Sequence, residues 1–142
     1  MKQMKKSATS IVSRLDGKIL TVYNQTYKGY VLPGGKVEDN ESVIDAQRRE
    51  LKEETGLDST YATLCYKGQS CTDPEREVYV FLVMAKGEPK ETEIGSPVLW
   101  LTQEEIIKQS PFHEFYEEMF TAIHYWYKRG EILTELTDYG NT

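Results

Sequence analysis

Long apolar runs, internal repeats and paired cysteines are all missing from this chain of 142 residues. No segment reaches the roughly 20 consecutive apolar residues of a membrane-spanning helix. The basic first residues are not followed by the apolar stretch of a secretory signal, so we expect a cytoplasmic protein with no membrane partner. The only cysteines are Cys65 and Cys71, and His113 and His124 lie elsewhere without zinc-site spacing. We therefore expect reduced structural thiols.

Positive charge is also scarce in this sequence. Lys and Arg number 17 against 23 Asp and Glu, which gives a net charge of −6 and an isoelectric point near 5.0. Long nucleic acids are bound mainly through Lys and Arg, so this balance disfavours them as partners. It suits a small anion that is held through a metal ion. The length fits one domain over 1–142. We expect residues 131–142 to form a loose tail, and the protein to be a monomer or homodimer.

Turn residues and β-rich runs predict a series of strands. Asp16-Gly17 between two apolar runs is typical of a hairpin with a type I′ turn, because such a turn needs positive φ. The apolar run that ends at Ala85 reads as a central strand covered on both faces. The expected strands span 8–15, 18–23, 61–66, 77–85 and 98–101, with a short extended piece at 30–32.

Three helices complete the expected pattern. One begins near Glu41 or Ser42, with Asn40 as its N-cap. Thr102 and Glu105 predict a capping box for a short helix that ends near residue 108. Ser110-Pro111 should open the last helix, which Gly130 would end. Its apolar residues recur at spacings of three and four, typical of a core-facing stripe: Phe112, Phe115, Tyr116, Met119, Ile123 and Trp126. These elements predict an α/β fold with a mixed sheet and helices on both sides.

The stretch from Gly35 to Leu57 gives the strongest functional signal. Glu50, Glu53 and Glu54 would share one helix face, since residues three and four apart are neighbours on a helix. Three adjacent carboxylates repel one another unless a cation lies among them, and Mg²⁺ prefers such oxygen ligands. Val43 and Ala46 continue the same face as an apolar stripe. The carboxylates should therefore lie at the rim of a core contact, where a cleft would be.

The fixed positions of this stretch also form a known pattern. They are Gly35, then after five residues Glu41, then after seven residues Arg49-Glu50-Leu51, then Glu53-Glu54 and Gly56-Leu57. This pattern resembles the Nudix box at every fixed position, and Leu32-Pro33-Gly34 extends the resemblance. The resemblance implies a Nudix-type α/β/α sandwich with a mixed β-sheet. It also implies an enzyme that hydrolyses a diphosphate linkage attached to a nucleoside, with Mg²⁺ or Mn²⁺ as cofactor.

The resemblance further implies roles for single residues. Glu50 and Glu54 would be metal ligands, and Glu53 would be a further ligand or the base that acts through a metal-bound water. The family varies in which carboxylate is the base, so these roles stay open. Arg49 would orient a carboxylate of the site, with Glu41 as its partner.

Two further metal ligands are implied outside the helix. One is the backbone carbonyl of Gly34, although an ordinary tight turn would also explain the glycine pair. The other is a carboxylate from the loop before the strand that carries Trp100. Glu93 is the candidate there, and Glu91 is its competitor.

Substrate contacts are less well specified. Many relatives place an arginine where this chain has Tyr23-Asn24, so Arg14 or Lys36 would have to hold a phosphate instead. Aromatic side chains that could stack on a base, although such residues are more often core, are Tyr23, Tyr30, Tyr79 and Phe81.

Three functions remain open on the sequence. The leading hypothesis is a MutT-like enzyme that acts on a (d)NTP or related nucleotide. An NDP-sugar, a dinucleoside polyphosphate or a 5′-triphosphate RNA is the alternative substrate. A catalytically silent nucleotide-binding module is the third, and the retention of every box carboxylate argues against it.

Overall fold

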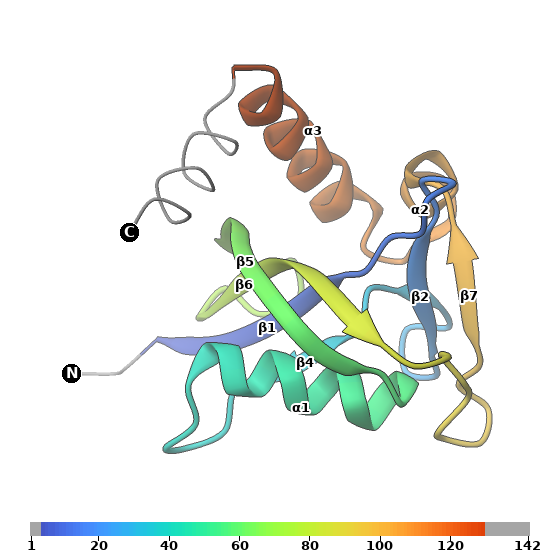
Figure 1. Cartoon of the computed structure of the whole chain (residues 1–142). Helices are drawn as coiled ribbons and strands as arrows, with labels where there is room; N and C mark the ends of the chain where they lie inside the picture. The colour runs from blue at the N-terminus through green and yellow to red at the C-terminus, as the bar shows by residue number, and fades with distance from the viewer. Residues whose placement is uncertain (1–3, 130–142) are drawn as a thin grey trace, which may run out of the picture.

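The computed structural model describes the backbone of residues 4–129 and the side chains of residues 4–125. Seven strands and three helices make up the described part of the chain (Figure 1). In order they are β1 (Lys5–Ile11), β2 (Ile19–Asn24), β3 (Gly29–Val31), β4 (Gly34–Lys36), α1 (Val43–Thr55), β5 (Asp58–Gln69), β6 (Arg76–Lys86), β7 (Val98–Leu101), α2 (Gln103–Gln109) and α3 (His113–Arg129).

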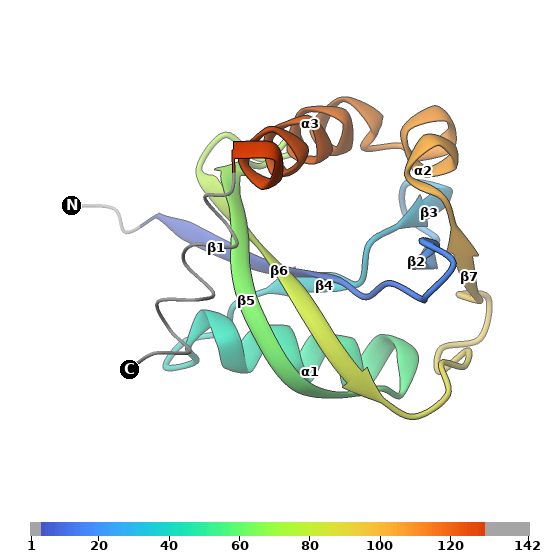
Figure 2. The same cartoon turned by 45° about the horizontal axis from the view of Figure 1, so that its top comes forward.

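The strands form two sheets. The larger has the order β4-β1-β6-β5, with β1 parallel to β6 and the other neighbours antiparallel, so it is the mixed sheet that was expected. Helix α1 covers one face of this sheet and α3 lies on the other (Figure 2). The smaller sheet is antiparallel, in the order β3-β2-β7, and it stands beside the first with α2 packed against it. The sequence did not indicate this division into two sheets.

The core has two parts, one on each face of the larger sheet. Strand β6 contributes to both, because successive strand side chains point to opposite faces. Val80 packs on the α3 side and Phe81 on the α1 side, which confirms the central strand. Leu51 of α1 and Ile106 of α2 are fully buried. Truncating either to Ala should cost about 2–5 kcal/mol of stability.

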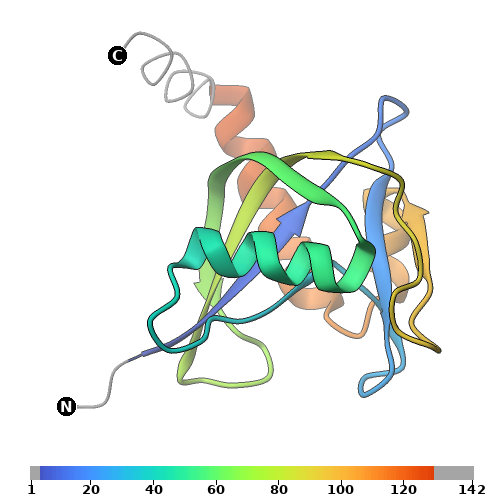
Figure 3. The same ribbon diagram turned by 60° about the horizontal axis from the view of Figure 1, so that its bottom comes forward.

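Helix α1 lies across the larger sheet, as Figure 3 shows from the helix side. Its N-cap is Ser42, whose hydroxyl accepts the Asp45 N–H at 3.1 Å, so the prediction of Asn40 was wrong. Asn40 instead has a φ of 65°, which suits a residue in the preceding turn. Gly56 ends the helix in the left-handed conformation with a φ of 78°, as expected.

The predicted hairpin at Asp16-Gly17 is present but short: Ser13 and Ile19 form an antiparallel bridge, and the Leu20 N–H donates to the Val12 carbonyl at 2.9 Å. The turn itself is present: the Arg14 N–H donates to the Lys18 carbonyl at 2.8 Å, and Gly17 has a φ of 85°. Asp16 does not have positive φ, so the turn is not of type I′. Strand β1 ends at Ile11, earlier than expected, and pairs with β4 and β6, because the chain crosses here from the larger to the smaller sheet.

Other boundaries also differ from the sequence-based expectation. The glycine pair, expected in a turn over 32–35, instead begins the strand Gly34–Lys36, which pairs with β1. Strand β5 is twice as long as predicted and has two register shifts against β6. Helix α3 begins at His113 because Ser110 caps the end of α2 and accepts the Phe112 N–H. The Trp126 side chain, Gly130 and the tail 131–142 lie outside the residues that the structure describes.

Several predictions at the end of the chain are confirmed. Strand β7 has the expected bounds, and the Thr102–Glu105 capping box is formed, with distances of 3.0 and 3.1 Å. The α3 stripe packs in the core through Tyr116 and Met119. Within residues 4–129, no helix has the length and apolar character needed to cross a membrane.

Candidate active site

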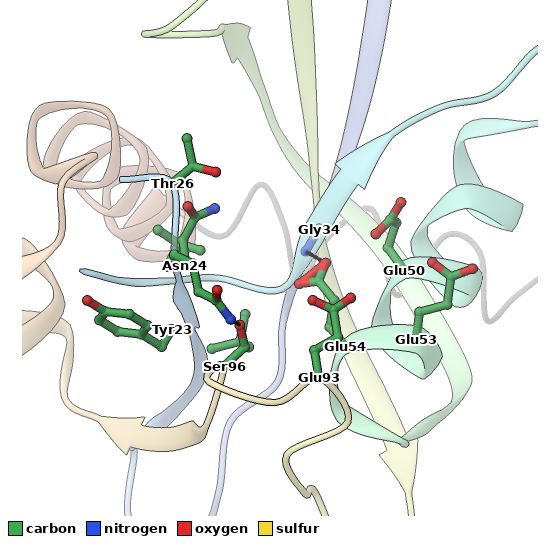
Figure 4. A pocket seen from close by; sticks show the side chains of 12 residues that line it. Tyr23, Asn24, Thr26, Gly34, Glu50, Glu53, Glu54, Glu93 and Ser96 are labelled. Atoms are coloured by element: carbon green, nitrogen blue, oxygen red, sulfur yellow. Dashed lines mark hydrogen bonds between the residues drawn. The ribbon is translucent and has the colours of Figure 1, made fainter. Parts of the chain in front are cut away.

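The carboxylates of α1 line a cleft of about 370 Å³. Glu50, Glu53 and Glu54 project from the C-terminal half of the helix, with Gly34 of β4 opposite them (Figure 4). Glu93, from the loop between β6 and β7, reaches the same cleft beside Glu54. A helix and a loop that are distant in sequence therefore bring four carboxylates to one cavity, beside the backbone of β4 at Gly34.

The other wall of the cleft is polar and uncharged. Tyr23, Asn24 and Thr26 come from the end of β2 and the following turn, and Ser96 comes from the loop before β7 (Figure 4). Gln25 connects these two segments, because its amide donates to the Ile94 carbonyl at 2.8 Å and to the Ser96 hydroxyl at 3.1 Å. This contact fixes the loop that carries Glu93 against the smaller sheet.

Arg49 organises the acidic side of the cleft. Its guanidinium binds both oxygens of Glu41, at 2.7 and 2.9 Å, which is the pairing expected from the sequence. It also donates to Glu50 at 2.8 Å and to Glu53 at 3.3 Å. These hydrogen bonds hold the pKa of Glu41 down at about 2 and raise that of Arg49. Arg49 therefore stays charged and holds two of the cleft carboxylates in place.

Glu54 is the most confined of the four carboxylates. Its Oε1 accepts the Gly34 N–H at 3.1 Å, the only dashed contact at its carboxylate in Figure 4. Burial, with the negative charges of Glu50 and Glu93 nearby, raises its pKa well above the ordinary value. An ionised Glu54 here needs a compensating cation.

The donor chemistry of the cleft fits a hard divalent cation. All four acidic side chains offer oxygen atoms, which Mg²⁺ prefers. Among the described residues, no three His, Cys, Asp or Glu side chains are already gathered around one point, since Arg49 binds Glu50 and Glu53. A cation would therefore draw these two side chains toward Glu54.

Both glycines of the Gly34-Gly35 pair lie where a side chain would collide with neighbouring atoms. A Cβ at Gly34 would lie 2.5 Å from the Ala8 carbonyl oxygen, and one at Gly35 would lie 2.5 Å from Oε1 of Glu50. Neither glycine has positive φ. Gly35 therefore leaves room for the Glu50 carboxylate, a reason that the sequence did not reveal.

The structure separates the two candidates in the loop before β7. Glu93 lines the cleft, whereas the Glu91 carboxylate accepts the Gly95 N–H at 2.8 Å and so closes the loop on itself. Two contacts join this loop to the end of α1: the Lys90 N–H donates to the Thr55 carbonyl at 3.0 Å, and the Thr92 hydroxyl donates to the Glu53 carbonyl. The loop position of Glu93 is thereby tied to the helix that carries the other carboxylates.

A second pocket of about 290 Å³ adjoins the cleft, and both are lined by Asn24, Val31 and Gly34. Its floor is the face of the larger sheet that α1 does not cover, represented by Thr9 and Val78. Aromatic side chains from the smaller sheet's turn and from the start of α3 also line it: Tyr27, Phe112, Phe115 and Tyr116. This pocket is the apolar neighbour of the acidic cleft.

Comparison with known proteins decides the family. Residues 4–123 match the model of the NUDIX domain, which is well over half of the chain. The chain belongs to the Nudix family. The resemblance seen in the Gly35–Leu57 box is thus confirmed over nearly the whole described structure.

Solved Nudix structures share the fold. The chain is 27% identical to a MutT Nudix hydrolase from Burkholderia pseudomallei, with a TM-score of 0.63 over 72% of this chain and 86% of that one. It is 25% identical to the ORF135 protein from E. coli, with a TM-score of 0.67 over 86% of this chain and 91% of that one. The Nudix-type architecture expected from the sequence is therefore confirmed.

Two sequence relatives match only over a short region. The mRNA-decapping protein D10 of Fowlpox virus is 42% identical over 43 residues, which cover 30% of this chain and 19% of the relative. The uncharacterized Nudix hydrolase YvcI of Bacillus subtilis is 43% identical over 49 residues, 34% of this chain and 31% of the relative. The matched part is thus under a third of the length of either relative.

Of the four substrate residues expected in this Nudix chain, two line a pocket of the site and two lie outside both pockets. Tyr23 lines the cleft, and Lys36 lines the second pocket. Arg14 lies 4.7 Å from the Trp100 ring and pairs with Asp16 at 2.9 Å, so it does not line the cleft. Tyr79 packs on the α1 side of the sheet. It is one residue out of phase with Val78, which faces the second pocket.

Sequence reasoning missed the polar residues that position the Nudix helix and loop. Gln47 of α1 is fully buried, and it donates to the Ser10 hydroxyl at 3.0 Å and accepts from Ser59 at 3.1 Å. Gln25 joins the Glu93 loop to the smaller sheet. No local sequence signal marks such residues, because their partners are distant in the chain.

Proposed function

We propose that this protein hydrolyses a diphosphate linkage in a nucleoside diphosphate derivative, in the manner of MutT, with a (d)NTP or related nucleotide as substrate and Mg²⁺ as cofactor. The observation that carries the proposal is the convergence of Glu50, Glu53, Glu54 and Glu93 on one cleft beside Gly34. The Nudix family membership and the MutT structure among its structural neighbours support it. Mn²⁺ is the alternative cofactor.

Each residue of the cleft has a distinct task in this proposal. Glu50, Glu54 and Glu93 would hold the cation, with the Gly34 carbonyl as a further ligand. Such a cation neutralises phosphoryl charge and lowers the pKa of a bound water. The Glu53 side chain is 55% exposed against 16% for Glu50, and it would accept a proton from the attacking water. Arg49 keeps Glu50 and Glu53 oriented, and Glu41 fixes Arg49.

The second pocket supports a nucleoside as the remainder of the substrate. It adjoins Gly34, so a group bound there would carry its phosphates into the cleft. The Tyr27 and Phe112 rings are in edge-to-face contact, 4.9 Å apart, and present apolar surface to the pocket. Aromatic surfaces of this kind stack well on nucleobases. Tyr23 in the cleft and Lys36 in the second pocket remain proposed substrate contacts.

A panel of nucleotides tests the proposal. Purified protein would be incubated with each (d)NTP, NDP-sugars, dinucleoside polyphosphates and a 5′-triphosphate RNA, with Mg²⁺, and product phosphates would be measured. We expect nucleotide hydrolysis that is lost in EDTA and restored by added Mg²⁺ or Mn²⁺. Activity that persists after exhaustive EDTA treatment would contradict the metal-dependent mechanism. Tight nucleotide binding without any turnover would support a silent binding module.

A further inference from the structure

The second pocket differs from the cleft in the sign of its charge. Four glutamates and no Lys or Arg line the cleft, whereas Lys36 and Arg76 and no Asp or Glu line the second pocket, as far as the described residues go. Cations in an apolar pocket of a protein with net charge −6 are unexpected unless they serve a ligand. They indicate an anionic group at the end of the pocket that is remote from the four glutamates.

Strand pairing places these two cations on the same face of the sheet. Lys36 is in register with Ser7, and Ser7 with Val78, so the three side chains form one row across β4, β1 and β6. Arg76 precedes Val78 by two residues and therefore points to the same face. Along β4, Lys36 is two residues from Gly34, a distance of about 7 Å. This separation leaves room for one nucleoside between the cleft and the cations.

Arg76 is held firmly, and its ion pair with a carboxylate is long. Its Nη1 donates to the Lys6 carbonyl at 3.0 Å and to the Ser7 hydroxyl at 3.3 Å, and its side chain is 13% exposed. The nearest carboxylate, Asp73, is 3.8 Å away and also binds Lys5 at 3.4 Å. Lys36 has no carboxylate within 4.0 Å among the described residues. The lining of the second pocket is therefore positively charged, while Glu38, Asp39 and Glu41 lie with Lys36 and Arg76 around a neighbouring pocket.

We infer that Arg76 and Lys36 form a subsite for a phosphate attached to the far side of the nucleoside, beyond the one that carries the scissile diphosphate. The inference rests on the proposed function, because it takes the nucleoside to lie in the second pocket. Because Nη1 of Arg76 is already engaged, Nε and Nη2 would face the phosphate oxygens, and Lys36 would add a point charge. The substrate class is then a 5′-polyphosphorylated nucleoside with a 3′-phosphate, either free or linking to a next nucleotide. A single such contact is compatible with the net charge of −6.

Hydrolysis rates test the subsite with three related substrates. They are GTP, its 3′-phosphate derivative, and the dinucleotide GpA with a 5′-triphosphate, together with their adenosine counterparts. We expect kcat/KM to be about tenfold higher for both 3′-phosphorylated forms than for the plain triphosphate, mainly through KM. Arg76→Gln should bring this ratio close to one. The control is Lys67→Gln. Lys67 is an exposed cation on β5, and its partners Glu77 and Tyr79 lie on the α1 side of the sheet. This variant should keep the parental ratio of kcat/KM between the 3′-phosphorylated and plain triphosphates.

A free 3′-phosphate and an internucleotide phosphate give different patterns of gain in kcat/KM. Equal gains for the free 3′-phosphate and the dinucleotide mean that the phosphate alone is recognised, and a gain for the dinucleotide alone means that an internucleotide linkage is required. A parent ratio near one, or a high ratio that survives Arg76→Gln, overturns the inference.

A binding measurement separates this inference from the proposed function. Calorimetry would compare guanosine 3′,5′-bisphosphate with 5′-GMP, and adenosine 3′,5′-bisphosphate with 5′-AMP, none of which needs to be hydrolysed. If no nucleotide is hydrolysed but a bisphosphate binds about tenfold more tightly in an Arg76-dependent way, the subsite stands and the proposed function fails. The opposite result is that triphosphates are hydrolysed, the bisphosphates bind no more tightly than 5′-GMP and 5′-AMP, and a 3′-phosphate does not raise kcat/KM. In that case the proposed function stands and the subsite fails.

Discussion

Arg49 in the middle of α1 and Glu41 just before the helix form a two-point ion pair, with Nε–Oε2 at 2.7 Å and Nη2–Oε1 at 2.9 Å. The same guanidinium reaches Glu50 and Glu53, so the pair connects the loop before α1 to the carboxylates in the cleft. Arg49 also donates to the Lys36 carbonyl at 3.0 Å, which ties β4 to the helix. A change at Glu41 should therefore affect both stability and the site.

The first prediction concerns the pH dependence of this pair. The pKa of Glu41 is lowered from 4.5 to about 2 in the folded protein. A lowered folded pKa means that the stabilisation is present above about pH 4.5 and is lost as the pH falls toward 2. We expect Glu41→Gln to lower the urea midpoint at neutral pH, and the difference from the parent to shrink progressively below about pH 4.5. A difference that is independent of pH would show that the ion pair does not stabilise the fold.

The second prediction concerns Glu54. Glu54→Gln removes the charge of a proposed metal ligand with little change of shape, and we expect kcat to fall about 100-fold, near 3 kcal/mol of transition-state stabilisation. Because burial disfavours the charged form of Glu54, the metal-free variant should be at least as stable as the parent. Added Mn²⁺ should raise the Tm of the parent more than that of the variant. Lys52→Gln is the control, since Lys52 is exposed and pairs with Asp58. A folded Glu54→Gln enzyme with parental activity would remove Glu54 from the mechanism.

The third prediction compares the two loop glutamates. Glu93 lines the cleft, so Glu93→Gln should lower kcat more than it raises KM, because the lost charge acts mainly in the transition state. Glu91→Gln should be nearly silent, since an amide oxygen can still accept the Gly95 N–H. Both variants would be measured at saturating Mg²⁺. Equal activity of parent and both variants would mean that the loop supplies no ligand.

The fourth prediction concerns the space beside Glu50. In Gly35→Ala, the new Cβ would collide with the Glu50 carboxylate, which is the end of a flexible side chain and can move aside. We expect folding to survive and kcat/KM to fall about tenfold or more, because Glu50 leaves its position. Gly68→Ala is the matched control, since its Cβ would crowd the Tyr66 ring at 2.9 Å outside the cleft. If Gly35→Ala were fully active, the close approach of β4 to Glu50 would have no functional role.

The sequence by itself determined the family, the helix of the Nudix box and the face on which its carboxylates lie. These features follow from local rules: helical spacing places Glu50, Glu53 and Glu54 together, and Gly56 ends the helix with positive φ. The Thr102 capping box and the β7 strand were also local signals, and both were found as expected.

Tertiary structure decided what depends on residues that are distant in the chain. The choice between Glu93 and Glu91 was open on the sequence, because it depends on how the loop before β7 packs against Gln25 and α1. The side of the sheet on which Tyr79 lies depends on strand phase, and a shift of one residue reverses it. The hairpin at Asp16-Gly17 is shorter than expected, because β1 pairs with β4 and β6 and leaves only the residues next to the turn to pair with the start of β2. Local sequence fixes spacing along one element, whereas strand pairing and loop packing are settled by burial of the whole core.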